Sequence, residues 1–271
     1  MKPPATYLYA LQPGEVTPPI EKDGTWVSEH PDIAAVSSNG AITALKEGYT
    51  LVLCKDKDGA PLVRAEIKVG SKVPPDSILK AIEFALQDWI DASGRVFEKK
   101  NVYTLWHNPA AKDGFGWCGA FVGYQFFRAG VPMDKAYRQK EAAPLADGSP
   151  FAVSQASQTK LYEGFVSRNR ISGIPQTGYY IVYGRKGSTP YTHIGLVTRV
   201  EDMGEGKYLL ETVEGNLSNR IKRFSYVYDS MTERKEKNIS PIPENRQTQP
   251  ETFFYEYVDN FYLNAFGQTW Y

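Results

Sequence analysis

A pair of prolines divides this sequence into two parts with different patterns. The stretch Gly70 to Pro75 ends in Pro74-Pro75, and consecutive prolines continue neither a helix nor a central strand. Short apolar runs between turn residues precede the prolines, and a helical pattern follows them. A chain of 271 residues is long enough for two modest domains. We therefore expect a small domain at residues 1–70, a linker at 71–75 and a larger domain at 76–271.

The first part is predicted to be an all-β sandwich. Asn39-Gly40, Glu47-Gly48 and Asp58-Gly59 supply the positive φ angles that tight turns require. Cys54 falls in an apolar run, which predicts a core position for it. The expected strands are Val16 to Ile20, Trp26-Val27, Ala34 to Val36, Ala41 to Leu45, Tyr49 to Cys54 and Val63 to Val69.

The second part is predicted to have the α+β order, with helices first and an antiparallel meander afterwards. One helix is expected to be capped by Asp76 or Ser77 and to stop at Gly94, and the expected positions of two others are Cys118 to Ala129 and Gln155 to Tyr162. The expected strands are Tyr179 to Tyr183, Ile194 to Val200, Tyr208 to Val213 and Arg220 to Tyr226.

The C-terminal region has two distinct stretches. Residues 229 to 250 are charged and contain prolines, which predicts a long loop. The last part of the chain, from Phe253 to Tyr271, is rich in aromatic residues that could stack on sugar rings. Core packing is the interpretation that we favour for them, because aromatic side chains dominate cores. The aromatic residues are Phe253, Phe254, Tyr255, Tyr257, Phe261, Tyr262 and Trp270.

Composition excludes several classes of function. Lys and Arg number 31 and so do Asp and Glu, so the balanced charge argues against nucleic acid or an anionic membrane as partner. Two cysteines cannot build a disulfide framework, and the three histidines include no H-E-x-x-H pair, so we expect neither a metal nor another cofactor. No apolar run has the length of a membrane span, and Met1 to Thr6 lacks the apolar core of a signal peptide.

Cys118 is the candidate nucleophile. It lies in Trp117-Cys118-Gly119-Ala120, where a glycine-containing loop leads into a predicted helix. The free N–H groups and the positive end of the dipole at a helix start favour the thiolate, which is the reactive form of cysteine. A core cysteine is the alternative interpretation, since free cysteines are usually buried.

Two later segments supply the partners that a thiol nucleophile needs, a base and a polar group that orients it. His193 stands at the head of the segment Thr192-His193-Ile194-Gly195-Leu196-Val197. Strand alternation puts His193 and Gly195 on one face, and Gly195 leaves that face open near the imidazole. Glu214 and Asn216 are separated by Gly215 on the following strand, so we expect both side chains on one face.

These three segments, in this order, are similar to the motifs of the CHAP amidase and peptidase family, which is papain-like. The resemblance covers about residues 76 to 228. The region from Trp26 to Gly48 resembles the bacterial Ig-like domain of group 2. Together they predict an α+β papain-like catalytic domain preceded by a small Ig-like sandwich.

The resemblance implies a role for each matching residue. Cys118 would be the nucleophile, His193 the general base and acid, Glu214 the residue that orients His193, and Asn216 a residue that helps to polarise the site. The sequence does not identify a second hydrogen-bond donor for the oxyanion that forms when the thiolate attacks a carbonyl group. The expected substrate cleft includes Gly116, Trp117, Trp106 and His107, of which His107 is the alternative base.

The activity implied is cleavage of amide bonds in bacterial peptidoglycan, by an N-acetylmuramoyl-L-alanine amidase or a stem or crossbridge endopeptidase. The protein would be secreted or delivered to the cell envelope or periplasm. Delivery without a signal peptide would fit a lysin or an antibacterial effector, and an effector predicts an immunity protein as partner. The alternative is a catalytically silent surface module that binds the cell wall or a partner.

Overall fold

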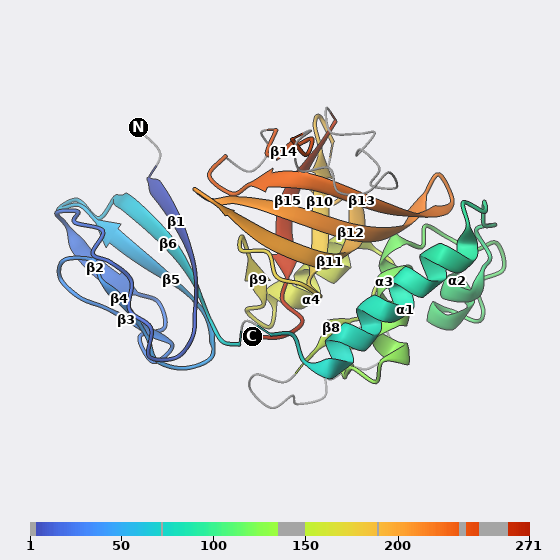
Figure 1. The fold of residues 1–271 in the computed structure, drawn as a ribbon, viewed down its shortest axis with the longest axis horizontal. Helices are drawn as coiled ribbons and strands as arrows, with labels where there is room; N and C mark the ends of the chain where they lie inside the picture. Colours follow the sequence, from blue (N-terminus) through green and yellow to red (C-terminus); the bar gives the residue numbers. More distant parts are fainter. Residues whose placement is uncertain (1–3, 72, 135–149, 189, 233–236, 244–259) are drawn as a thin grey trace. The chain divides into compact units, whose positions relative to one another are not determined.

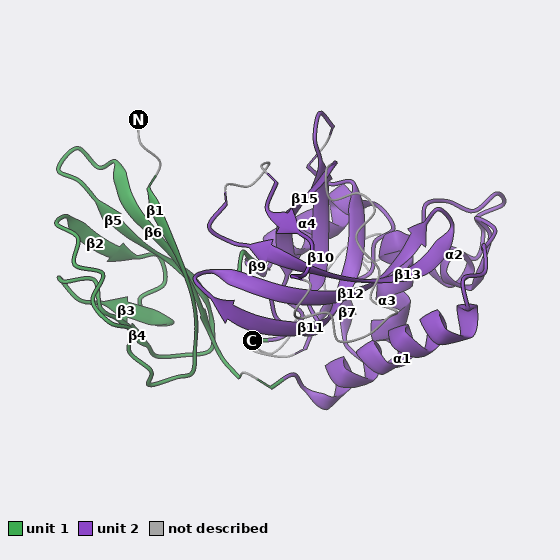
Figure 2. Cartoon of the chain, turned by 45° about the horizontal axis from the view of Figure 1, so that its top comes forward, with its two compact units in different colours: residues 1–73, 172–174, 271 green, residues 74–171, 175–270 purple. Residues whose placement is uncertain are grey.

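The structure of the protein is a computed structural model. It describes all residues except 1–3, 72, 135–149, 189, 233–236 and 244–259. The chain forms two compact units, which are coloured separately in Figure 2. Unit 1 contains residues 1–73, 172–174 and 271, and unit 2 contains residues 74–171 and 175–270. The chain first passes from unit 1 to unit 2 between Val73 and Pro74, inside the expected linker, and residues 172–174 and 271 belong to unit 1 again.

Unit 1 is built from two sheets. The larger has the order β1-β6-β5-β2, with β1 (Ala5–Leu11) parallel to β6 (Pro61–Val69). The smaller pairs β3 (Ala34–Val36) with β4 (Ile42–Ala44). The remaining strands are β2 (Thr25–Ser28) and β5 (Gly48–Lys55).

Two details of unit 1 differ from the expectation. The prediction of a strand at Val16 to Ile20 is wrong. Within this segment only Val16 pairs with another strand, through an isolated bridge to Thr43. Pro18 and Pro19 lack the amide hydrogens that a paired strand needs. The strand β1 was not among the predicted runs, and its Tyr7, Tyr9 and Leu11 alternate against the core of unit 1. Cys54 is fully buried, as its apolar run predicts.

Unit 2 begins with helices. The helix α1 (Asp76–Ala92) has Pro75 at its N-cap, so neither Asp76 nor Ser77 caps it. Ser157 caps α4 (Gln158–Val166), so this helix starts later than the predicted helix at Gln155 to Tyr162. It also ends later. The short α2 (Val102–His107) was not predicted, although Asn101 and Thr104 form a capping box at its start. The helix that carries the candidate nucleophile is α3 (Cys118–Arg128).

A seven-stranded sheet follows the helices, in the order β14-β13-β12-β11-β10-β15-β9. Its central strands are antiparallel neighbours in the sheet and along the chain. The strands are β9 (Ile171–Ser172), β10 (Tyr180–Arg185), β11 (His193–Gly204), β12 (Lys207–Leu217), β13 (Arg220–Asp229), β14 (Ile239–Ser240) and β15 (Phe261–Gly267). A separate parallel pair joins β7 (Met133–Asp134) to β8 (Ala152–Val153).

The C-terminal segment completes this sheet. Strand β15 pairs with β10, and Tyr262, Phe266 and Trp270 are buried in the core of unit 2. These residues therefore pack in the core, as we favoured, and do not form an exposed sugar-binding surface. The aromatic residues Phe253, Phe254, Tyr255 and Tyr257 lie outside the described residues.

Helices α1 and α3 pack against the strands β11 to β13, as Figure 1 shows. Gly215 on β12 permits the close approach of α3, because a Cβ at this position would lie 2.6 Å from the Cβ of Phe121. None of the described helices is long and apolar enough to cross a membrane.

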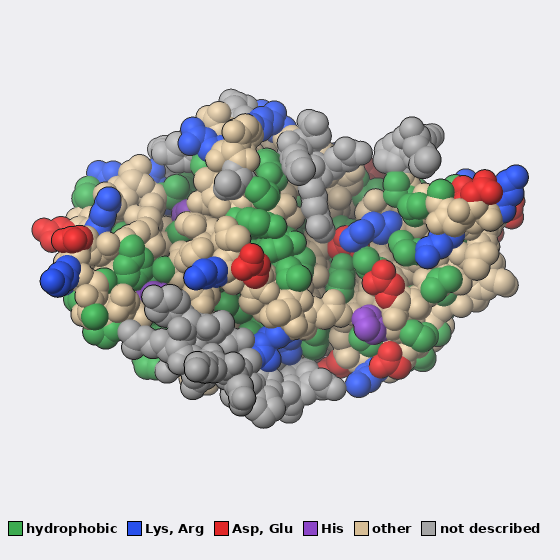
Figure 3. Space-filling view, turned by 180° about the vertical axis from the view of Figure 1, so that it is seen from behind, with side chains coloured by type: hydrophobic (Ala, Val, Ile, Leu, Met, Phe, Trp, Pro, Cys, Tyr) green, Lys and Arg blue, Asp and Glu red, His purple; other side chains and the backbone are tan. Residues whose placement is uncertain are grey.

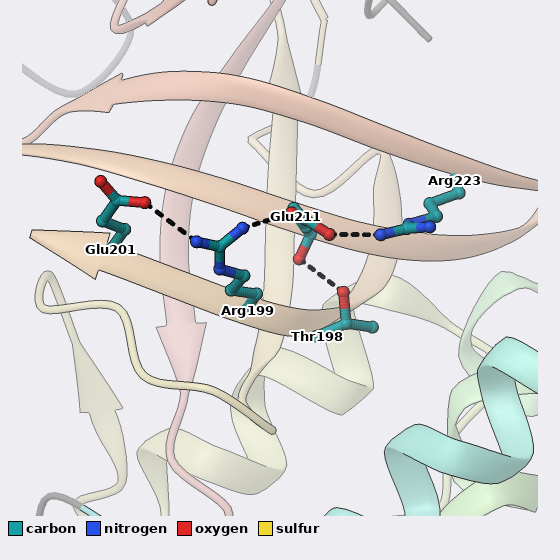
Figure 4. A network of polar contacts seen from close by, with 5 residues as sticks. All are labelled: Thr198, Arg199, Glu201, Glu211 and Arg223. Carbon is teal, nitrogen blue, oxygen red and sulfur yellow. Dashed lines mark hydrogen bonds and ion pairs between the residues drawn. The ribbon is translucent and has the colours of Figure 1, made fainter. Parts of the chain in front are cut away.

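A charged network ties the same three strands together (Figure 4). The carboxylate of Glu211 on β12 accepts hydrogen bonds from Arg199 on β11, at 3.1 Å, and from Arg223 on β13, at 2.5 Å. Thr198 donates to the backbone oxygen of Glu211, and Arg199 also pairs with Glu201. Because Arg199 is half exposed, its pairs contribute at most about 1 kcal/mol each to stability.

The packing of α3 predicts the effect of adding one methyl group at two glycines. Gly215→Ala should lower the free energy of unfolding by about 1–3 kcal/mol, because the new Cβ overlaps Phe121. In Gly123→Ala the nearest atom would be a Trp106 carbon at 3.4 Å. This control should leave stability unchanged or raise it by up to about 1 kcal/mol, because alanine favours the helix. Denaturant unfolding of both variants checks this, and equal losses would contradict the packing account.

Candidate active site

Cys118 is the first residue of α3, and no side chain caps this helix end. The N-cap residue is Trp117, so the N–H groups of the first turn have no intrahelical partner and the helix dipole points its positive end at the thiol. The backbone of Gly119 also makes a hydrogen bond to the Cys118 sulfur. Cys118 is only 1% exposed.

His193 lies at the start of β11 and connects Cys118 to Glu214. Its Nε2 is 2.9 Å from Glu214 Oε2, and the imidazole shares a second hydrogen bond with the Cys118 thiol. Since Nε2 faces the carboxylate, Nδ1 is the atom left for the sulfur. The structure thus brings together three of the four predicted catalytic residues in the order thiol, imidazole, carboxylate.

Gly195 was expected to leave the strand face open near the imidazole, and the structure shows which side chain uses that space. A Cβ on Gly195 would lie 2.8 Å from Glu214 Cγ. The missing side chain therefore provides the space through which Glu214 on β12 reaches across to His193 on β11. Glu214 is fully buried, and His193 is 6% exposed.

Gln158 belongs to the site and was missed by the sequence analysis. Its Nε2 donates a hydrogen bond to Cys118 Sγ at 3.2 Å. Gly119 allows this contact, because a Cβ there would lie 2.2 Å from the backbone oxygen of Gln155, just before α4. The sequence offers one signal for Gln158, its amide side chain directly after the helix-capping residue Ser157. Nothing in the sequence connects the start of that helix to Cys118.

The surroundings of Cys118 and His193 favour the charged pair. Burial opposes ionisation of the thiol, but the hydrogen bond and positive charge of His193, with the hydrogen bonds of Gln158 and Gly119, lower the pKa of Cys118 below its ordinary value. Burial likewise disfavours imidazolium, but Cys118 and Glu214 raise the pKa of His193 to about 10. The two groups are coupled, so thiolate and imidazolium form together.

Regular strand alternation ends at Asn216. The register between β12 and β13 shifts after Glu214, and Asn216 has a φ of 66°, so a bulge breaks the alternation. Its amide nitrogen is 3.5 Å from the position of a Cβ on Gly116. Asn216 therefore lies beside the loop that leads to Cys118, and the hydrogen bonds of His193 run to Cys118 and Glu214 instead.

The predicted cleft residues lie in different surroundings. Trp117 is fully buried against Tyr103, with ring centroids 5.2 Å apart, so it belongs to the core and does not line a cleft. Trp106 packs on Tyr124 of α3, toward the helix end away from Cys118. His107 packs on Phe115, and the histidine bonded to the nucleophile is His193, not His107.

Among the described residues, no group of three or more His, Cys, Asp or Glu side chains could hold a metal ion. Comparisons of the chain with models of protein families, with curated proteins and with solved structures find no significant match. The assignment to a family therefore stays a resemblance between motifs, and the geometry of Cys118, His193, Glu214 and Gln158 is what bears on function.

The charged pair predicts an ultraviolet thiolate absorbance that persists below the pH at which an ordinary thiol ionises. In His193→Gln the cation is lost while burial remains, so the pKa of Cys118 should rise above its ordinary value and the absorbance should disappear at neutral pH. The measurement is a pH titration of the thiolate absorbance, with Cys118→Ser as the baseline.

Cys54 supplies the internal control, because burial raises the pKa of its thiol. Cys54→Ser should therefore leave the neutral-pH absorbance unchanged. A signal that follows Cys54, or that survives in His193→Gln, would contradict the ion-pair description.

Proposed function

We propose that this protein is a cysteine hydrolase that cleaves amide bonds of bacterial peptidoglycan. The observation that carries the proposal is the hydrogen-bonded series from Cys118 through His193 to Glu214, with the thiol pKa lowered and the imidazole pKa raised. A thiolate at a helix start, beside an imidazolium that a carboxylate orients, is the arrangement that acyl transfer to cysteine requires.

In the first half of the reaction, the thiolate of Cys118 attacks the carbonyl carbon and the carbonyl oxygen becomes an oxyanion. Cys118 is almost completely buried, so the substrate must displace the amide of Gln158 from the sulfur. The released N–H of Gln158 can then donate to the oxyanion together with the backbone N–H at the start of α3. The bond to nitrogen breaks as His193 transfers its proton to the leaving amine, and a thioester remains on Cys118.

In the second half, water replaces the amine. Neutral His193 accepts a proton from water as the oxygen attacks the thioester carbon, and the same two donors bind the second oxyanion. Collapse releases the carboxylic acid and regenerates the thiolate and the imidazolium. Glu214 keeps Nε2 of His193 in place through both halves, so Nδ1 faces the reacting atoms each time.

Peptidoglycan is the substrate class that we infer from the sequence motifs and the charge. The segments around Cys118, His193 and Glu214 resemble those of cell-wall amidases and peptidases. On the face shown in Figure 3, Lys and Arg side chains are interspersed with Asp and Glu and form no single basic patch. This pattern suits a substrate of mixed charge better than a nucleic acid. The half-buried amide of Asn216 lies beside Gly116, where it can bind the backbone of a peptide.

Purified sacculi test the proposed activity. Wild-type protein should release soluble fragments, and Cys118→Ala should lower the rate by about 10⁴-fold or more, because it removes the nucleophile. Mass spectrometry of the fragments distinguishes the bond cleaved. New L-Ala amino termini indicate an amidase, and D-amino-acid or crossbridge termini indicate an endopeptidase. Binding of wild-type protein to sacculi without any cleavage would overturn the proposal in favour of a silent binding module.

The role of Gln158 has its own test. Gln158→Ala should lower kcat about 10²- to 10³-fold, the usual effect of losing one oxyanion donor, with a smaller change in KM. Gln158→Glu is the matched variant, since it keeps the shape but puts a negative charge beside the oxyanion, and it should be at least as impaired. Full activity in Gln158→Ala would show that the amide only covers the thiol.

A further inference from the structure

Glu214 has a second carboxylate oxygen that the catalytic series does not use. Its Oε2 faces His193, but the whole side chain is 0% exposed, so Oε1 needs donors from the protein. Tyr183 on β10 donates to Oε1 at 2.6 Å, and Thr212 on β12 donates to it at 2.8 Å. Both donors are hydroxyl groups, so they satisfy the oxygen without adding a positive charge.

Tyr226 on β13 closes these contacts into a ring. Its hydroxyl oxygen is 2.5 Å from that of Tyr183, and a side-chain hydrogen bond joins it to Thr212. The ring holds three hydroxyl protons. Those of Tyr183 and Thr212 point to the carboxylate, so the proton of Tyr226 is shared between the two other hydroxyl oxygens. Tyr183, Thr212 and Tyr226 are all fully buried.

Tyr183 also contacts the imidazole itself. Tyr183 and His193 are opposite residues in the pairing of β10 with β11, and their rings stack with centroids 5.8 Å apart and planes 27° from parallel. Tyr183 therefore restrains His193 twice, once by its ring and once through Glu214.

We propose that Tyr183, Thr212 and Tyr226 are positioning residues that fix the rotamer of Glu214 and through it hold His193 with Nε2 on the carboxylate and Nδ1 on Cys118. This inference rests on the proposed hydrolase function and extends it to a layer of neutral hydroxyl groups. Because the three hydroxyl groups carry no charge, they hold Glu214 without neutralising the negative charge that faces His193.

Tyr183→Phe tests the proposal, since it keeps the ring and removes the donor. A carboxylate that can turn away pairs with Nε2 less often, so the Nε2 proton resonance of His193 should broaden and exchange faster with water. On sacculi, kcat should fall roughly tenfold to 100-fold with KM nearly unchanged, and the alkaline limb of the pH profile should move to lower pH. Tyr226→Phe leaves both bonds to Glu214 in place and should have a smaller effect in the same direction.

Tyr179→Phe is the matched control. Its hydroxyl is also buried and donates to the backbone oxygen of Trp270 at 2.9 Å, away from Glu214. It should leave the His193 resonance and kcat unchanged. If Tyr183→Phe behaves like Tyr179→Phe in both readouts, the positioning role is wrong. If Tyr183→Phe fails to fold, Thr212→Val removes the other donor to Oε1, together with the hydrogen bond of Thr212 to Tyr226, and decides by the same criteria.

The nuclear magnetic resonance readout separates the two proposals. It follows only three histidines, His30, His107 and His193, and needs no substrate. If wild-type protein does not cleave sacculi but Tyr183→Phe still loosens the Nε2 proton, the peptidoglycan activity is wrong and the positioning role stands. If wild-type protein cleaves sacculi but His193 does not respond to Tyr183→Phe, the activity stands and the positioning role is wrong.

Discussion

The hydrogen bond between His193 and Glu214 is the interaction on which the rest of the candidate site depends. Glu214 is completely buried and His193 nearly so, and a buried charge without a partner is costly. Removing one member of a buried ion pair typically costs about 3–5 kcal/mol, because the other is left uncompensated. Cys118 is joined to the same series through His193, so its reactive form depends on a carboxylate that it does not touch. The thiolate form of Cys118 on α3 therefore depends on the correct register of strands β10 to β13.

Three glycines make this geometry possible, each where another element enters its side-chain space. Gly195 admits the side chain of Glu214, Gly215 admits Phe121 of α3, and Gly119 admits the backbone before α4. In each case a Cβ would lie less than 3 Å from an atom of the neighbour. The glycines thus permit close approach between strand and strand, between strand and helix, and between helix and loop. These three approaches bring the four residues of the candidate site to one place.

The sequence predicted the elements that local patterns determine. The apolar periodicity gave α1, α3 and strands β10 to β13, and the motif order indicated Cys118, His193 and Glu214. What it missed depends on distant contacts. Gln158 reaches the thiol from a turn that packs on Gly119 through Gln155, and β1 was overlooked because its partner β6 lies far along the chain. Strand alternation could not place Asn216, because a β-bulge follows Glu214 and the side-chain pattern gives no clear signal of it. Trp117 was expected in the substrate cleft because of its position next to Cys118, whereas its ring packs in the core.

The two cysteines of the chain show what distinguishes the candidate nucleophile from a core residue. Both are buried, with 0% exposure for Cys54 and 1% for Cys118, so burial alone would keep both thiols protonated. The Cys54 thiol points to two acceptors, the backbone oxygens of Lys22 and Asp23, which favour the protonated form. Cys118 is instead surrounded by donors, from His193, Gln158 and the backbone of Gly119, and these favour the thiolate. The direction of the surrounding hydrogen bonds therefore decides which of the two buried thiols is stabilised as a thiolate.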